Sequence, residues 1–189
     1  LGTNTNFHDR FIPDYEVLKG VVKALKDKGL KIVLAQGVYD LIHESHALYL
    51  AAAKSYGDVL IVGADSDALT KTRKGPNRPI VPQEERIKML VHLRPVDIVT
   101  IREAHQDMGD LIRLVEPHVL VTSSSTQDFK DDLGSGKYEK YCDKIVTLPP
   151  QATTSTTARI RILTIDGAEK LASEVQKLTQ EYLAKIRKG

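Results

Sequence analysis

The chain of 189 residues contains no tryptophan and only one cysteine, Cys142. A lone cysteine cannot form an internal disulfide, so we expect the protein in a reducing compartment, the cytoplasm. No apolar run approaches the roughly 18 residues of a membrane span, and the first residues, LGTNTNFHDR, lack the apolar core of a signal peptide. Neither sign of charge predominates, because 27 Lys and Arg residues stand against 25 Asp and Glu residues. We therefore expect neither a membrane nor a nucleic acid as a partner.

What the sequence does contain is a regular alternation of apolar runs and helical patterns. Five short runs, mostly rich in Val and Ile, are typical of strands in a parallel sheet that is covered on both faces. These runs are Lys31–Gln36, Asp58–Ala64, Asp97–Ile101, His118–Thr122 and Lys144–Leu148. The helical patterns between them are His46–Ser55, Gln83–Leu93 and Asp110–Val115. The alternation predicts an α/β fold with a doubly wound, five-stranded parallel sheet.

Two further helical patterns flank this unit. The first, Tyr15–Lys28, follows an N-terminal extension, residues 1–14. The second, Ala168–Lys188, carries an apolar stripe that consists of Leu171, Val175, Leu178, Tyr182 and Ile186. We predict one domain, residues 15–167, and a C-terminal helix, residues 168–189, that packs on the domain or joins another subunit.

The stretch GVYDLIHESH, residues 37–46, places two histidines just beyond the first predicted strand. Gly37 lets a phosphate approach the backbone closely, and the helix start that follows offers free N–H groups and the positive end of its dipole. His43 and His46 fit one face of the first helical turn. Together these features predict an anion site with two imidazole donors. A zinc site, for which no third ligand has suitable spacing, and plain packing or surface histidines remain as alternatives.

Two further clusters suit phosphate groups. The segment KTRKGPNRP, Lys71–Pro79, has four basic residues within eight positions, and its glycine and prolines predict a loop on the ligand side of the sheet. The segment TTSTTARIR, Thr153–Arg161, puts five hydroxyl side chains before two arginines at an expected helix start. A solvated face and an ordinary helix N-cap are the alternative interpretations. Three such clusters on one α/β scaffold favour a polyphosphate ligand.

Four motifs occur together: G-x-[FY]-D-x-x-H-x-x-H, K-G-x-x-R-P, an E-x-R helix and a late S-T-T. With them, the sequence from about Tyr15 to Ile162 resembles the nucleotidyltransferases with an H-x-G-H signature. It is most similar to the adenylyltransferase domain of the bacterial ADP-heptose synthases, and more distantly similar to glycerol-3-phosphate cytidylyltransferases. The resemblance implies a Rossmann-like fold and transfer of a nucleoside monophosphate from ATP or CTP to a phosphorylated small molecule, with release of pyrophosphate. It also implies Mg²⁺ carried by the nucleotide, no dedicated metal ligands, and a homodimer.

The resemblance assigns roles to individual residues by position. The catalytic residues, which would stabilise charge in the transition state, are His43, His46 and Lys74. The nucleotide-binding residues are Gly37, Val38, Tyr39, Asp40, Arg86, Ser155, Thr156 and Thr157. For Asp40, a purely structural role is the alternative. The acceptor-binding residues are Ser124, Asp128 and Phe129.

The match departs from the family at several places. Ser45 stands where the family usually has glycine, and VTSSSTQDF, residues 121–129, lacks a lysine and two glycines that the heptose enzymes have. The late S-T-T also lacks the Arg-Thr pair that precedes it in the cytidylyltransferases, and this departure from the resemblance favours ATP over CTP. We therefore expect an adenylyltransferase for a sugar phosphate such as a heptose 1-phosphate. The alternatives are a CTP-dependent cytidylyltransferase for a polyol or amino-alcohol phosphate, and a nucleotide-binding paralogue without catalysis.

Overall fold

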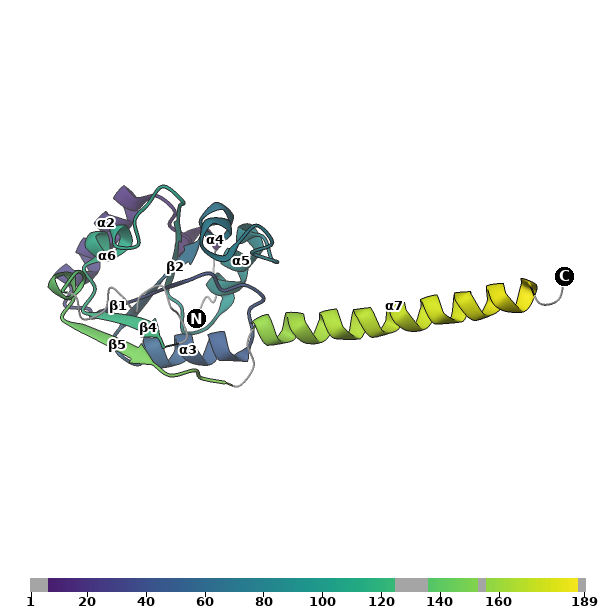
Figure 1. Cartoon of the computed structure of the whole chain (residues 1–189). Coiled ribbons are helices and arrows are strands. Elements are labelled where there is room, and N and C mark those ends of the chain that lie inside the picture. Colours follow the sequence, from purple (N-terminus) through teal and green to yellow (C-terminus); the bar gives the residue numbers. More distant parts are fainter. Residues whose placement is uncertain (1–6, 125–135, 153–155, 187–189) are drawn as a thin grey trace. The chain divides into compact units, whose positions relative to one another are not determined.

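The computed structural model describes residues 7–124, 136–152 and 156–186, and the chain divides into two units, Leu1–Thr153 and Thr154–Gly189. The first unit is built on a sheet of five parallel strands (Figure 1). These strands are β1 (Ile32–Gly37), β2 (Val59–Asp65), β3 (Ile98–Arg102), β4 (Val119–Ser123) and β5 (Lys144–Leu148). Their order is β3-β2-β1-β4-β5, so the chain starts in the middle of the sheet and winds outwards in both directions. The predicted doubly wound α/β fold is confirmed.

All five predicted strands are present, and four of them lie one residue further along the chain than predicted. At the start of the first two strands the reason is a local polar contact. The N–H of Lys31 donates to the carboxylate of Asp58 at 2.8 Å, so both residues precede the ladder that begins with the pair Ile32 and Val59.

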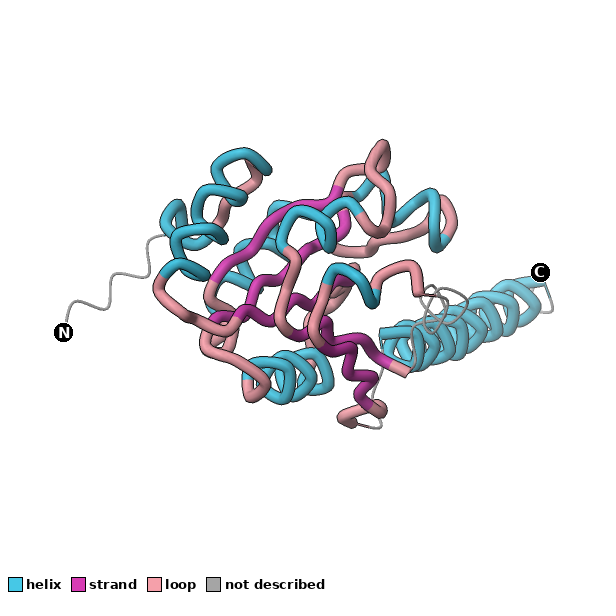
Figure 2. Tube along the Cα trace, turned by 90° about the vertical axis from the view of Figure 1, so that its left-hand side faces the viewer, coloured by secondary structure: helices cyan, strands magenta, loops and turns pink. Residues whose placement is uncertain are grey.

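Helices cover both faces of the sheet (Figure 2). On one face, α3 (Glu44–Lys54) and α5 (Gln83–His92) bury Leu50 and Leu90 against the strands. On the other face, α2 (Tyr15–Asp27) and α6 (Asp110–Val115) bury side chains such as Leu18, Leu111 and Ile112. Full burial of each such side chain contributes about 1.5–3 kcal/mol to the stability of the fold. The two apolar layers together hold the strands and their carboxyl ends in place.

One short helix of the first unit lies partly where the sequence predicts a loop. Lys71–Lys74, expected in a loop, form the last turn of α4 (Asp67–Lys74). The side chain of Ser66 caps this helix by accepting from the N–H of Leu69 at 3.1 Å, and Gly75, with a φ of 95°, ends it. The loop therefore begins at Gly75. The described residues of the first unit also contain the short helices α1 (Phe7–Arg10) and η2 (Glu139–Tyr141).

The second unit contains the helix α7 (Thr156–Ile186). It is continuous, so it includes both the helix start expected in Thr153–Arg161 and the apolar pattern expected from Ala168. Within the described part of the chain, no helix has both the length and the apolar character that crossing a membrane requires.

Candidate active site

The turn after β1 has an uncommon backbone conformation. Tyr39 and Leu41 have positive φ angles of 54° and 46°, in a left-handed region that costs non-glycine residues roughly 1–2 kcal/mol each. Tyr39 is nevertheless only 5% exposed and belongs to the core. Its ring lies against Gly37, where a Cβ atom would come within 3.3 Å of Tyr39 Cε2. Burial of the Tyr39 ring therefore supports the turn, and glycine at position 37 makes room for it.

The two histidines meet at the start of α3. His43 is the N-cap residue, and its backbone N–H donates to Nδ1 of His46 at 3.4 Å. Their rings lie 4.1 Å apart between centroids, and the Tyr39 ring meets His46 edge to face at 5.6 Å. The structure thus brings together the two side chains whose spacing predicts one face of a helical turn.

The environment of His46 sets its protonation state. Burial lowers the pKa of His46 from 6.5 to about 4; the neighbouring His43 adds to this effect, and Asp40 opposes it. The imidazole is therefore neutral at pH 7. Because Nδ1 accepts from the N–H of His43, the ring proton belongs on Nε2. His46 can present this Nε2–H group to a phosphate oxygen.

Asp40 connects the histidine turn to the segment after α4. Its carboxylate accepts from the backbone N–H groups of Ile80 and Val81, at 3.0 Å each for the shorter contacts, and from Nη1 of Arg78 at 2.7 Å. Burial alone would raise the pKa of Asp40, but these donors hold it below its ordinary value of 3.8. Both oxygens of Asp40 are engaged with the protein, which favours the structural role.

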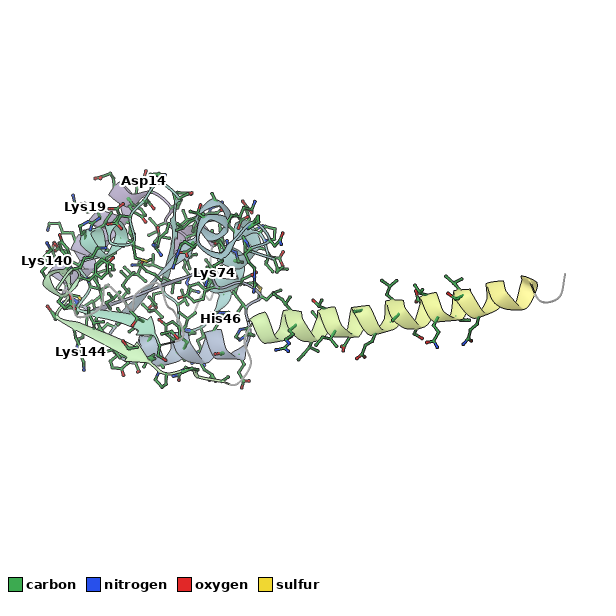
Figure 3. The ribbon with its side chains drawn as sticks, viewed as in Figure 1. Asp14, Lys19, His46, Lys74, Lys140 and Lys144 are labelled. Atoms are coloured by element: carbon green, nitrogen blue, oxygen red, sulfur yellow. The ribbon has the colours of Figure 1, made fainter. Side chains whose placement is uncertain are left out.

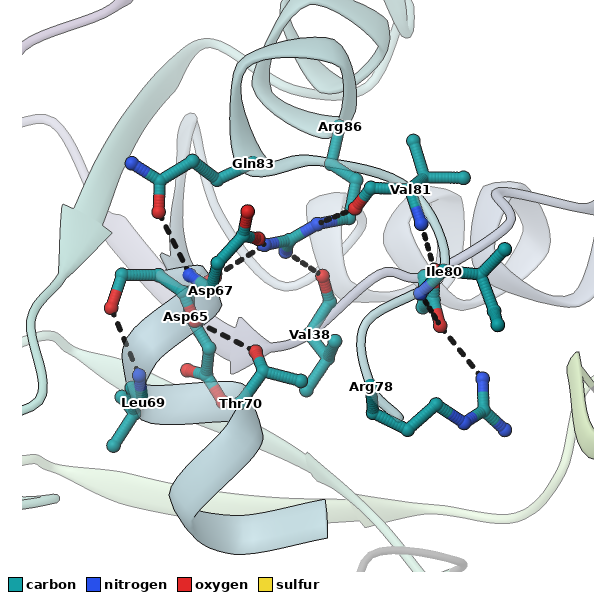
Figure 4. Close-up of polar contacts among 12 residues, drawn as sticks. Val38, Asp65, Asp67, Leu69, Thr70, Arg78, Ile80, Val81, Gln83 and Arg86 are labelled. Atoms are coloured by element: carbon teal, nitrogen blue, oxygen red, sulfur yellow. Dashed lines mark hydrogen bonds and ion pairs between the residues drawn. The ribbon is translucent and has the colours of Figure 1, made fainter. Parts of the chain in front are cut away.

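Arg86 lies in the interior of the first unit and is 0% exposed. Its guanidinium donates to the carbonyl oxygens of Val81 (2.9 Å), Asp65 (2.9 Å) and Val38. It also pairs with the Asp67 carboxylate at 2.7 Å (Figure 4). These contacts tie α5 to the turn after β1 and to the end of β2. They favour a role in positioning the turn over the phosphate contact expected from the sequence.

The basic residues around α4 differ in their surroundings. Lys74 is exposed and forms no hydrogen bond or ion pair with any residue that the structure describes. It lies on the same side of the first unit as His46 (Figure 3). Arg73 pairs with Asp65, which also pairs with Arg102 at 2.8 Å. The sequence carries no signal for this cluster, because only the β2–β3 register places positions 65 and 102 side by side.

Of the other expected site residues, three lie in the described part of the chain and three lie outside it. Ser124 follows β4, and its N–H donates to the Leu148 carbonyl at 2.9 Å. Thr156 and Thr157 begin α7 in the second unit. Ser155, Asp128 and Phe129 lie outside the described residues.

Comparison with known proteins identifies the family. Residues 34–163 match the family model described as "Cytidylyltransferase-like". The chain belongs to this family. Two proteins named "Bifunctional protein HldE", from Aliarcobacter butzleri and Nitratiruptor sp., are 37% and 38% identical over 84% and 81% of the chain. The chain spans about a third, 32%, of the length of each. Membership of the cytidylyltransferase-like family confirms the predicted relationship to nucleotidyltransferases.

A solved structure supports the fold of this family member. It is the lipopolysaccharide core biosynthesis protein from Thermoplasma volcanium, which is 24% identical and superimposes with a TM-score of 0.56. The match covers 67% of this chain and 100% of the other.

Proposed function

We propose that the chain transfers AMP from ATP to a sugar phosphate such as a heptose 1-phosphate and releases pyrophosphate. The observation that carries the proposal is the closely packed pair of His43 and His46 at the N-terminus of α3, in which His46 is neutral and offers a donor at Nε2. Membership of the cytidylyltransferase-like family supports the reaction class. The resemblance to the adenylyltransferase domain of ADP-heptose synthases supports ATP and a sugar phosphate as substrates.

The proposed reaction needs charge stabilisation rather than a general base. A phosphate monoester is mostly dianionic at pH 7, because its second pKa is about 6, so its oxygen attacks the α-phosphorus directly. One P–O bond forms to the acceptor, and the bond to pyrophosphate breaks. His43, His46 and Lys74, with the free N–H groups at the start of α3, would donate to the oxygens that gain charge. In known oxyanion sites one such donor contributes roughly 2.7–4 kcal/mol.

Around this centre, the remaining roles follow from the resemblance and from the observed contacts. Gly37, Val38 and Tyr39 would line the nucleotide, while Asp40 and Arg86 hold their turn in place. The residues that would cradle the triphosphate are Ser155, Thr156 and Thr157. The residues that would contact the acceptor are Ser124, Asp128 and Phe129.

We propose that Mg²⁺ enters with the nucleotide. Among the described residues, no three His, Cys, Asp or Glu side chains gather into a possible metal site. The nearby carboxylate of Asp40 is engaged with protein donors. This donor set fits an ion held mainly by phosphate oxygens, where it would neutralise part of their charge.

A CTP-dependent transferase that acts on a polyol or amino-alcohol phosphate is the second candidate. The observation that favours it is the family match itself, since the matching family is described as cytidylyltransferase-like. The two candidates share the histidine turn and differ in the base and the acceptor.

A pyrophosphate-release assay separates these possibilities. ATP and CTP are each combined with heptose 1-phosphate, mannose 1-phosphate, glycerol 3-phosphate and choline phosphate. We expect release with ATP and a sugar phosphate. Release with CTP alone would replace the proposal by the second candidate. Tight nucleotide binding without release from any pair would show a nucleotide-binding protein without catalysis.

We also propose that the chain forms a homodimer through α7. Leu171, Val175 and Leu178 are 62%, 54% and 64% exposed, and they recur at intervals of four and three residues, as in the seam of a coiled coil. Light scattering on the wild type and on a variant with Leu171→Glu and Leu178→Glu tests this proposal. We expect a dimer that the variant converts to a monomer; a monomeric wild type or an unchanged dimer would contradict it.

A further inference from the structure

One face of the sheet becomes polar at its carboxyl edge. This is the face covered by α2 and α6, to which Leu34 of β1 and Ile98 of β3 contribute apolar side chains. Because alternate residues of a strand share a face, Gln36 of β1 and Thr100 and Arg102 of β3 lie on the same side. The register places Gly63 of β2 between them, paired with Gln36 on one flank and Thr100 on the other.

Gly63 lets these side chains come together. A Cβ atom at Gly63 would lie 2.5 Å from Cδ2 of Leu111, 3.1 Å from Cδ of Arg102 and 3.4 Å from Cγ of Gln36. The side chains of Gln36 and Arg102 therefore lie against the same backbone position, under the cover of α6.

The polar atoms of this group are buried without hydrogen-bond partners in the described part of the chain. They are both amide atoms of Gln36, Oγ1 of Thr100 and Nε of Arg102. Thr100 and Arg102 are only 0% and 2% exposed. Each buried unpaired group costs about 1–3 kcal/mol, and native proteins keep few of them. Several of them around one glycine indicate a binding partner that the protein itself does not supply.

The chemistry of these atoms selects the kind of partner. The other nitrogens of Arg102 are engaged, Nη1 with Asp65 at 2.8 Å and Nη2 with Sδ of Met108 at 3.4 Å. The unpaired set is mixed, because Arg102 Nε–H and the Gln36 amide nitrogen donate, the amide oxygen accepts, and the Thr100 hydroxyl does either. A phosphate or carboxylate group only accepts hydrogen bonds. It has no proton for the Gln36 oxygen, and the Asp65 carboxylate would repel its charge. Hydroxyl groups, which donate and accept, match the whole set.

We propose that Gln36, Thr100 and Arg102 form a subsite for hydroxyl groups of the acceptor and select polyhydroxylated phosphates over simple ones. The inference rests on the proposed function and deepens it. Gln36 directly precedes Gly37, so the subsite adjoins the proposed nucleotide turn. Its polar atoms are buried, so a side chain that covers them must move before a ligand can bind. Met108 is the one we expect to move, because only a weak sulfur contact holds it to Arg102.

Two variants that keep the shape of the side chain test the subsite, Thr100→Val and Gln36→Met. Calorimetry measures binding of heptose 1-phosphate, mannose 1-phosphate and methyl phosphate to protein saturated with a non-hydrolysable ATP analogue. We expect the wild type to bind a sugar phosphate more tightly than methyl phosphate. Each variant should weaken that binding about three- to tenfold, as loss of a hydrogen bond implies, and should leave methyl phosphate and nucleotide affinities unchanged. Equal affinity for all three phosphates, or unchanged variants, would overturn the proposal.

Buried water is the alternative partner for these polar groups. The stability of the Thr100→Val variant distinguishes water from a ligand. If water alone satisfies these groups, Thr100→Val should lower the midpoint of urea unfolding and leave sugar-phosphate affinity unchanged, which would overturn the subsite. If the hydroxyl serves a ligand, the midpoint should stay equal or rise. Thr122→Val is the matched control for stability, since Thr122 already pairs with the Thr147 hydroxyl at 3.0 Å, and its loss should lower the midpoint.

The same measurements separate the subsite from the reaction. Sugar-phosphate binding that the variants weaken, without any pyrophosphate release, would reject the reaction and keep the subsite. Turnover of a sugar phosphate with the same KM in the wild type and both variants would reject the subsite and keep the reaction.

Discussion

Arg78 and Asp40 are 38 residues apart in the sequence and form an ion pair with 2.7 Å between Nη1 and Oδ2. The pair is largely buried, with 21% and 6% of the two side chains exposed. Asp40 also accepts the backbone N–H groups of Ile80 and Val81. Through these contacts, a single carboxylate joins the turn that carries the histidines to the segment that follows the basic helix α4.

Asp40→Asn should therefore destabilise the protein. Asparagine has a similar shape but no charge, so the largely buried ion pair with Arg78 is lost, and breaking such a pair costs about 3 kcal/mol. Urea unfolding measures the loss. The control is Asp27→Asn, which removes an exposed ion pair with Lys23 and should change the unfolding free energy by no more than about 0.5 kcal/mol. Similar losses in the two variants would show that the Asp40 contacts do not hold the turn.

The low pKa of His46 makes stability depend on pH. Its folded-state pKa is about 4 and its ordinary value is 6.5, so between these values the unfolded chain binds more protons, and stability falls as the pH falls. The shift corresponds to a loss of about 2 kcal/mol from this residue between pH 7 and pH 5. Urea unfolding at both pH values should show a smaller pH effect for His46→Gln than for the wild type. The exposed His105 provides the control, and an identical pH effect in His46→Gln and His105→Gln would refute the assignment.

His43→Ala should abolish most of the pyrophosphate release and leave the fold intact. His43 is the N-cap residue of α3, and its ring lies against that of His46. Loss of an N-cap side chain typically costs about 1 kcal/mol, so the domain should still fold. Loss of one donor to the transition state lowers kcat about 10²–10³-fold. Circular dichroism checks the fold, and His92→Ala, at the exposed end of α5, is the control for the loss of a histidine. Full activity in His43→Ala would place the chemistry elsewhere.

The parts of the structure that the sequence predicts are those with local signals. Continuous Val and Ile runs mark strands wherever they lie, and the spacing of His43 and His46 is itself the geometry of a helical turn. Lys71–Lys74 were misassigned because Gly75, Pro76 and Pro79 predict a loop. The contact that caps the helix, from the N–H of Leu69 to the side chain of Ser66, is seen only in the folded chain.

The contacts that organise the site have no local signal. Asp40 with Arg78 and Asp65 with Arg102 meet only because strands and loops distant in the chain end at the same sheet edge. Arg86 shows how such contacts change the role that the sequence predicts for a residue. Its place in an E-x-R motif predicts a phosphate contact, whereas the folded chain surrounds its guanidinium with protein acceptors.

Gly63→Ala should disturb the proposed acceptor subsite and the core together. The added methyl would lie 2.5 Å from Leu111 Cδ2, so α6 or the side chains of Gln36 and Arg102 must shift, at a cost of about 1–3 kcal/mol. Gly20→Ala is the control, because Gly20 lies inside α2 with open space around it. There the change should stabilise the helix by about 0.5–1 kcal/mol. The midpoint of thermal unfolding should therefore fall in Gly63→Ala and rise in Gly20→Ala. A higher midpoint in both variants would contradict the close packing over Gly63.

Arg86→Lys separates a positioning role from direct phosphate binding. Lysine keeps the charge but cannot reach the acceptors on Val38, Val81 and Asp65 together, because it lacks the planar fork of the guanidinium. If Arg86 positions the turn, the variant should lose about 3 kcal/mol of unfolding free energy. Nucleotide affinity, measured by calorimetry, should weaken together with stability. Arg113→Lys is the control, since Arg113 forms its ion pairs at the surface and its replacement should leave both quantities nearly unchanged. An Arg86→Lys protein with wild-type stability and impaired nucleotide binding would instead show that the guanidinium acts on phosphate directly.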